Sequence, residues 1–140
     1  MAELDYTEEQ IVATRVADEN RAEFLPRFFG EYCLMGELTV QLWLAQLSTN
    51  YRGGYWHFYT LSNGGFYMAP EQQDALHLSV CGNHFDAKMS ADAAGIVATL
   101  FALNELLENE GGDKFVNFYY FLRDFVGCHP EESLIYAAID

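Results

Sequence analysis

Residues 53–70, whose sequence is GGYWHFYTLSNGGFYMAP, are rich in apolar and aromatic side chains and carry two glycine pairs. Asn63-Gly64 suits the two central positions of a type I′ turn, and successive residues of the strands beside such a turn point to opposite faces. The segment is therefore predicted to be a β-hairpin that ends at Pro70, because proline cannot donate to a strand ladder. The turn fixes the expected register, in which the facing pairs are Leu61 and Phe66, Thr60 and Tyr67, and Tyr59 and Met68.

Both faces of this hairpin are largely apolar and rich in aromatic side chains. Such a surface suits either a ligand platform or the centre of a core. We interpret it as core, in which aromatic and aliphatic side chains fill the space between a sheet and helices: Trp56, Phe58, Phe66 and Met68.

An alternating segment begins at residue 76. Leu76, Leu78 and Val80 are expected on one face of a strand, and the other face carries His77, Ser79 and Cys81. Short links join this strand to the hairpin. The three strands are therefore predicted to form one antiparallel meander.

The segment before the hairpin has the spacing of an α-helix. Leu34, Leu38 and Leu42 recur every four residues, which predicts a helix over residues 32–48. Further upstream, the apolar cluster in FLPRFFG is expected to dock on the body of the protein, while Pro26 disfavours a helix before it.

The chain after the strands has the pattern of helices. Ser90 as N-cap and Asp92 in the first turn start a helix that is apolar nearly all round, and so buried, until the glycine pair 111–112. Further helices are expected after Asp113 and after Pro130. Strands and helices in separate blocks predict an α+β fold, with a small antiparallel sheet of about three strands packed against several helices.

Length and composition predict a single compact domain over residues 1–140. With 51% hydrophobic residues the chain can bury a sizeable core, although about the first ten residues are acidic and expected to be flexible. Three widely spaced cysteines indicate reduced thiols rather than a disulfide framework. The opening MAELDYTEEQ lacks the apolar centre of a signal peptide, and no apolar run approaches the roughly 18 residues of a membrane span. These features predict a cytoplasmic protein without membrane attachment.

The net charge of −14 excludes some partners and leaves two interpretations open. Phosphates are attracted by Lys and Arg, so the excess of acids disfavours direct binding to nucleic acid or anionic lipid. Residues 1–37 carry nine acids and three bases, and residues 105–140 carry eight acids and two bases, whereas the middle is nearly neutral. Acidity favours a dispersed monomer. It also suits a protein that imitates a polyanion in a DNA-binding groove.

No constellation of residues has the pattern of an active site. On an extended strand His77 and Cys81 would lie roughly 13 Å apart, too far to share one metal ion. Cys128 and His129 are neighbours in sequence, which does not place a thiol beside a base, and the carboxylate pair at 131–132 is interpreted as a solvated face. The sequence therefore predicts no catalytic residue, metal or cofactor, and favours a non-enzymatic binding or inhibitor domain.

Four segments resemble the plasmid-borne antirestriction family typified by KlcA and ArdB: FLPRFFG, YRGGYWHFYTLSNGGFYMAP, MSADAAGIVATLFALN and HPEESLIYAAID. The resemblance extends from about Arg15 to Asp140. It implies a compact α+β fold and relief of type I restriction-modification of incoming plasmid or phage DNA in bacteria, as during conjugation. It implies no catalytic residue or cofactor, and inhibition through protein interaction or an indirect route.

The expected partners are type I restriction enzyme subunits or another host protein. Polar residues at the entrance of the hairpin and acidic residues elsewhere are the candidate contacts. They are Arg52, Tyr55 and His57 at the hairpin, Glu105, Glu108 and Glu110 before the glycine pair, and Asp140.

Two alternatives stay open. An acidic DNA mimic would directly occupy the DNA-binding groove of a restriction complex, although irregular acids and a radius of gyration of about 14 Å imitate a long duplex poorly. An enzyme that modifies the restriction machinery would lose its activity through a single His or Cys change without a change in stability.

Overall fold

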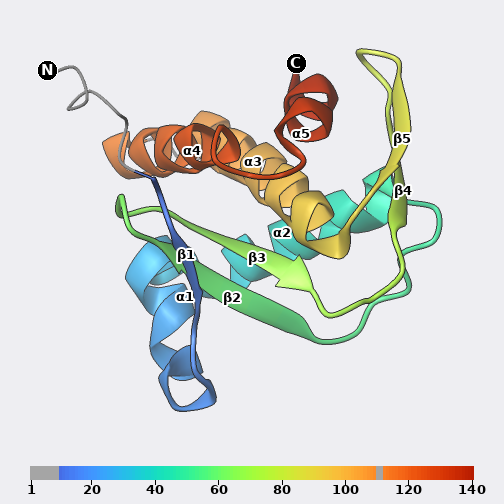
Figure 1. The fold of residues 1–140 in the computed structure, drawn as a ribbon. Helices are drawn as coiled ribbons and strands as arrows, with labels where there is room; N and C mark the ends of the chain where they lie inside the picture. Colours follow the sequence, from blue (N-terminus) through green and yellow to red (C-terminus); the bar gives the residue numbers. More distant parts are fainter. Residues whose placement is uncertain (1–9, 110–111) are drawn as a thin grey trace, which may run out of the picture.

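A computed structural model describes residues 10–109 and 112–140. Two small antiparallel sheets and several helices share one hydrophobic core cluster, which confirms the predicted α+β class (Figure 1). In chain order the elements are β1 (Ala13–Arg15), a 3₁₀ turn (Asp18–Asn20), α1 (Arg21–Phe29), a second 3₁₀ turn (Gly30–Tyr32), α2 (Cys33–Leu47), β2 (Trp56–Leu61), β3 (Phe66–Pro70), β4 (Leu76–Val80), β5 (Phe85–Met89), α3 (Ala91–Asn109), α4 (Asp113–Val126) and α5 (Glu132–Ile139).

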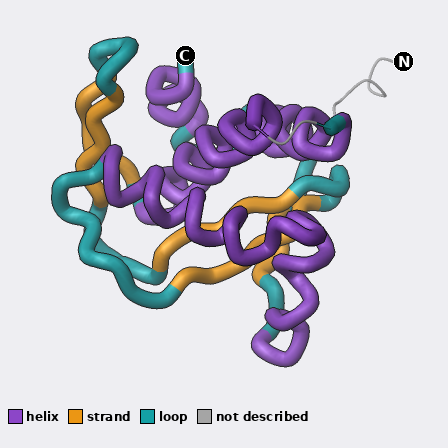
Figure 2. Tube along the Cα trace, turned by 180° about the vertical axis from the view of Figure 1, so that it is seen from behind, coloured by secondary structure: helices purple, strands orange, loops and turns teal. Residues whose placement is uncertain are grey.

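The three-stranded sheet has the order β1-β2-β3 and lies at the centre of the view in Figure 1, with α3 and α4 above it. The β4–β5 hairpin forms a separate sheet that stands at the side of the molecule. Figure 2 views the molecule from behind, and α2 lies nearest to the viewer there. α2 therefore covers the side that faces away from the viewer in Figure 1.

The β2–β3 hairpin is confirmed, but its predicted register is wrong by one residue. The observed facing pairs are Thr60 and Phe66, Tyr59 and Tyr67, Phe58 and Met68, His57 and Ala69, and Trp56 and Pro70. Tyr67 therefore shares a face with Tyr59, and their rings stack with centroids 4.6 Å apart. The other face carries the side chains predicted to be core, all of them buried: Trp56, Phe58, Phe66 and Met68.

The register differs because the turn has three residues rather than two. The backbone N–H of Gly64 donates to the carbonyl of Leu61 at 3.0 Å, and the N–H of Leu61 donates to the carbonyl of Gly65 at 2.9 Å. Gly64 has a φ of +100°, whereas Asn63 does not take a positive φ. This geometry is a type I turn followed by a bulge with glycine in the left-handed region.

The third strand of this sheet is β1, so the predicted meander through β4 is wrong. β1 pairs antiparallel with β2, with Arg15 opposite Tyr59. β4 pairs with β5, a strand that the sequence pattern did not reveal, across the turn 81–84. The open edge of β3 is covered by α3, where the N–H of Met68 donates to Oγ1 of Thr99 at 3.3 Å. No room remains there for another strand.

The predicted helices are found within the described residues. α2 occupies nearly all of the predicted span 32–48. Ser90 is the N-cap of α3, because its Oγ accepts the N–H of Ala93 at 3.1 Å. α3 ends at Asn109, and Gly111 of the predicted stop lies outside the described residues. In the described ranges, no helix combines the length and the apolar character needed to cross a membrane.

Pro26 lies inside α1, so the prediction that it disfavours a helix there is wrong. Proline in a helix interior costs about 3 kcal/mol. Packing of three aromatic residues of α1 offsets this cost, because the rings of Phe24, Phe28 and Phe29 lie 5.6, 4.4 and 5.3 Å from that of Phe66 in β3. The predicted docking of this cluster is confirmed.

α3 approaches the backbone of β3 at Gly95. A Cβ atom at this position would lie 2.3 Å from the carbonyl oxygen of Met68 and 2.4 Å from Cα of Ala69. Such distances are far inside van der Waals contact, and the obstructing atoms are backbone. The absence of a side chain at Gly95 therefore sets how closely the central helix packs on the sheet.

We expect Gly95→Ala to destabilise the protein by about 3 kcal/mol, because the added methyl group must push α3 away from β3. Gly82→Ala is the matched control, since a Cβ there meets nothing within 4 Å, and its effect should stay within about 0.5 kcal/mol. Urea denaturation measures both. Equal effects of the two substitutions would contradict the close approach.

Candidate functional site

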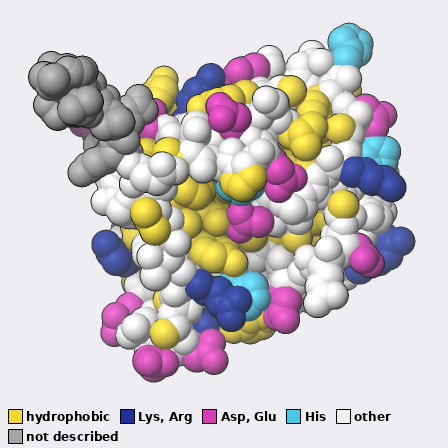
Figure 3. Space-filling model, viewed as in Figure 1, with side chains coloured by type: hydrophobic (Ala, Val, Ile, Leu, Met, Phe, Trp, Pro, Cys, Tyr) yellow, Lys and Arg dark blue, Asp and Glu magenta, His cyan; other side chains and the backbone are white. Residues whose placement is uncertain are grey.

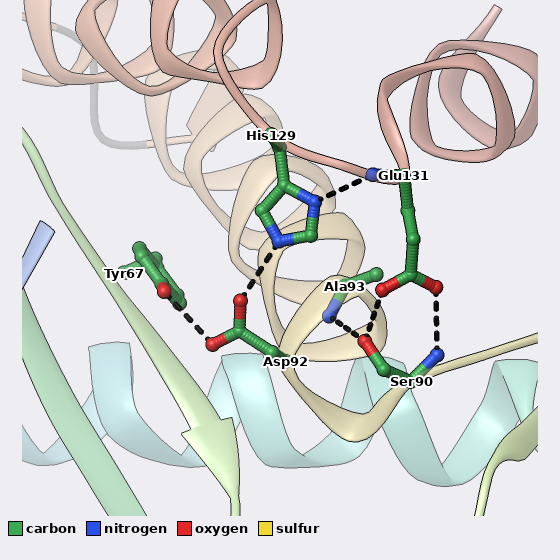
Figure 4. A network of polar contacts seen from close by, with 6 residues as sticks. All are labelled: Tyr67, Ser90, Asp92, Ala93, His129 and Glu131. Atoms are coloured by element: carbon green, nitrogen blue, oxygen red, sulfur yellow. Dashed lines mark hydrogen bonds and ion pairs between the residues drawn. The ribbon is translucent and has the colours of Figure 1, made fainter. Parts of the chain in front are cut away.

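A polar network joins the start of α3 to β3 and to the turn between α4 and α5 (Figure 4). The hydroxyl of Tyr67 donates to Oδ1 of Asp92 at 2.8 Å. Oδ2 of the same carboxylate lies 2.8 Å from Nε2 of His129, which is buried. Asp92 therefore holds together two side chains that are distant in sequence.

The second half of the network fixes the start of α3 to the start of α5 (Figure 4). The carboxylate of Glu131 accepts the backbone N–H of Ser90 at 2.9 Å and also the hydroxyl of Ser90. The interpretation of the pair 131–132 as a solvated face is therefore wrong for Glu131. No local pattern in the sequence indicates this contact, because the two residues are 41 positions apart.

The hydrogen bonds of His129 determine its tautomer. The backbone N–H of Glu131 donates to Nδ1 of His129 at 3.0 Å, so this nitrogen carries the lone pair. Nε2 therefore carries the hydrogen and donates it to Asp92. Both ring nitrogens are occupied, so the ring has no free lone pair to accept a proton from a substrate or from Cys128. The arrangement is that of a structural histidine rather than a general base.

Two tyrosines extend the network over the face of the sheet. Burial raises the pKa of Tyr67 far above its ordinary value, and the adjacent Asp92 carboxylate raises it further. Burial and Asp92 also raise the pKa of Tyr59, which hydrogen-bonds to Arg15. Both hydroxyls therefore stay protonated at neutral pH. The hydroxyl of Tyr67 donates to Asp92, whereas that of Tyr59 accepts from Arg15.

A hollow of about 300 Å³ lies beside this network. Its polar lining includes Arg15, His57, Glu71 and Asp92. Figure 3 shows apolar side chains gathered in a depression on this face, with basic, acidic and histidine side chains around it. The hollow is open and its charges are mixed, so it does not select one class of small ligand by charge.

The structure brings together two of the three candidates at the hairpin entrance. The ring of Tyr55 meets that of His57 edge-on, with centroids 5.3 Å apart, and Arg21 lies over Tyr55 at 4.5 Å. His57 also lies 3.5 Å from the carboxylate of Glu71. Arg52 is apart from this group and donates to a backbone carbonyl of its own loop.

The acidic candidates do not form one cluster. Glu105 accepts the indole N–H of Trp43 at 2.8 Å, and Glu108 is exposed on α3. Asp140 pairs with Arg123 at 3.3 Å. Glu110 lies outside the described residues.

The two residues weighed as metal ligands lie in different surroundings, and Cys81 is an exposed free thiol. His77 in β4 forms a cross-strand pair with Asp86 in β5. Over residues 10–109 and 112–140, no three His, Cys, Asp or Glu side chains are arranged to hold a metal ion.

Three of the sequence segments noted above meet in the polar network. The hairpin segment contributes Tyr67, the segment at the start of α3 contributes Ser90 and Asp92, and the C-terminal segment contributes His129 and Glu131. The family model described as "Antirestriction protein" matches residues 49–140, which include all of them. The chain belongs to the antirestriction protein family.

Relatives of known sequence and structure agree with this assignment. Two proteins of Escherichia coli named antirestriction protein KlcA are 48% and 52% identical to this chain, over 95% and 93% of its length and 97% and 94% of theirs. A solved structure from work on KlcA and ArdB is 46% identical, with a TM-score of 0.89 over 95% of this chain and 97% of that one. That work describes a novel fold and antirestriction activity against type I DNA restriction systems in vivo but not in vitro.

In this antirestriction protein, Asp92→Ala should lower the free energy of unfolding by about 2 kcal/mol, because it leaves the Tyr67 hydroxyl and the His129 N–H without their acceptor. Asp86→Ala is the matched control. Its carboxylate is 65% exposed, so its pair with His77 should contribute less than about 1 kcal/mol. Chemical denaturation measures both, and a cost for Asp92→Ala no larger than that of the control would contradict a structural role for the network.

The charge of His57 should depend on Arg15. Burial and the Arg15 guanidinium lower the pKa of His57, while Glu71 opposes them. Arg15→Gln should therefore raise this pKa, whereas Arg52→Gln should leave it unchanged; an NMR titration of the imidazole measures both.

Because the native pKa of His57 is lowered, the unfolded chain binds the proton first on acidification. The contribution of His57 to stability is therefore present above a pH of about 6.5 and is lost as the pH falls toward the native pKa. A titration in which Arg15→Gln lowers the pKa of His57 would contradict this account.

Proposed function

We propose that this chain relieves type I restriction of incoming plasmid or phage DNA in the bacterial cytoplasm, by acting through a protein partner or indirectly and not as an enzyme. The observation that carries the proposal is the behaviour of the structural relatives, whose activity is described in vivo but not in vitro. An activity that needs the cell indicates that another cellular component takes part.

The geometry of the polar network supports the non-enzymatic part of the proposal. An enzyme acting by acid–base chemistry needs a group that can exchange a proton with its substrate. In the network, His129 uses both nitrogens within the protein, and the Tyr67 hydroxyl is held protonated by its surroundings. The features shared by the family segments therefore serve the fold, and the surface is left to carry the activity.

Direct DNA mimicry is the alternative, and the net charge of −14 favours it. A duplex presents one charge per roughly 1.7 Å of axis, so a mimic needs closely and regularly spaced acids. Residues 38–104 contribute only four acids and two bases, although they include the strands β2 to β5. The charge is thus too unevenly spread to make mimicry the first choice.

A two-part experiment tests the proposal. Cells carrying a type I system and expressing the protein should plate unmodified phage at least tenfold more efficiently than cells without it, while modified phage should plate equally. Purified protein should neither inhibit the purified restriction enzyme nor compete with duplex DNA for it. Binding that DNA displaces and salt weakens would favour mimicry instead. A failure to relieve restriction in cells would refute the proposed function.

A further inference from the structure

The outward face of α2 carries an exposed apolar row, the leucine stripe, formed by Leu34, Leu38 and Leu42. These side chains are 79%, 54% and 58% exposed. Val40 and Leu44, on the buried face, lie two positions further along the helix, which places them about 200° away. Figure 2 shows α2 crossing the front of the molecule in that view, and the exposed fractions of the three leucines place the stripe on the solvent side of this helix.

Single exposed leucines are ordinary on protein surfaces, whereas contiguous exposed apolar rows mark interaction sites. The leucine stripe is of the second kind, because residues four apart on a helix are neighbours. Met35, 46% exposed, widens it at its first turn.

The charges around the stripe are of one sign. α2 and α3 contain no Lys or Arg. Glu37 flanks the stripe on one side, and on the other side Glu105 lies beyond Trp43, whose indole N–H it accepts. Glu108 is exposed further along α3. Two cations lie beyond these residues: Lys114, over the ring of Phe115 at 5.6 Å and beside Gly30 ahead of α2, and Arg123, which pairs with Asp140.

Two hollows adjoin on the side of the stripe that faces α3. One of about 200 Å³ is lined by Leu42 and Glu105, and one of about 550 Å³ reaches Asp140 and the β4–β5 turn. Trp43 and Gln46 line both, so the two hollows are neighbours. The described linings include carboxylates and no Lys or Arg.

We propose that the leucine stripe and the adjoining hollows bind an amphipathic helix of a partner protein, with an apolar ridge flanked by Lys and Arg. The inference rests on the proposed function, in which the chain acts through a protein partner. A helical ridge fits beside the stripe as helices pack in protein interiors. Its basic flanks would meet Glu37 and Glu105, toward the middle and the C-terminal half of α2.

The negative charge of the surface favours a basic helix over a second copy of this chain, nucleic acid or anionic lipid. A second copy of this chain would bring a molecule of net charge −14 and the same flanking carboxylates against each other. Nucleic acid and anionic lipid would be repelled for the same reason. A helix with an apolar ridge and basic flanks complements both the apolar leucine stripe and the carboxylates beside it.

The test uses a labelled synthetic helical peptide about five turns long, with leucines spaced four apart and flanked by Lys and Arg. A matched peptide carries Glu at every basic position. By fluorescence anisotropy, the basic peptide should bind at least tenfold more tightly than the acidic one. The double variant Leu38→Ser and Leu42→Ser should weaken binding at least tenfold. Val12→Ser, at an exposed apolar position just before β1, should not change the affinity.

Equal binding of the two peptides, or an unchanged affinity of a double variant that unfolds as cooperatively as the unaltered chain, would overturn the inference. So would a dimer in sedimentation that the double variant dissociates, because it would assign the stripe to a second copy. The phage-plating assay separates this inference from the proposed function. Relief that survives in a double variant unable to bind the peptide would overturn the inference alone, and no relief from the unaltered chain would refute the proposed function.

Discussion

The packing of α3 against the open edge of β3 is the constraint on which the rest of the fold depends. Gly95 lets the helix backbone approach the carbonyl of Met68, and Thr99 supplies an acceptor for the Met68 N–H. One contact thereby protects a sheet edge from other strands and buries a helix that is apolar nearly all round. β4 pairs with β5 instead, because α3 already covers the edge of β3 that a meander would use.

The polar network also holds α3 in place, because it joins the start of this helix to β3 and to the turn between α4 and α5. Ser90 and Asp92 lie at the start of α3. Each forms hydrogen bonds with residues that are distant in the sequence. His129 and Glu131 bring the end of α4 and the start of α5 to that same turn. Three of the segments that resemble the antirestriction family therefore meet through hydrogen bonds with one another.

If the family segments serve the fold, the activity belongs to the surface. The surface offers an acidic field, which discourages nucleic acid, and an exposed row of leucines on α2, which favours another protein. An activity described for the relatives in vivo but not in vitro is what a protein that needs a cellular partner would display. The exposed leucines of α2 and the carboxylates beside them are the features from which an apolar, basic partner is proposed.

The sequence by itself determined the features that depend on neighbours in the chain: the helices from α2 onward, the cap at Ser90, the existence of the hairpin, its aromatic core and the α+β class. Only the tertiary structure decided the hairpin register, set by a bulged turn, the separation of β4 from the main sheet, and the role of Glu131, which bonds 41 positions away. It also decided that Tyr55 and His57 meet while Arg52 stands apart. α2 is apolar on both sides, so its spacing could predict a helix but not which side would face the core. That choice is made by the surfaces that α2 packs against, and these are assembled from distant parts of the chain.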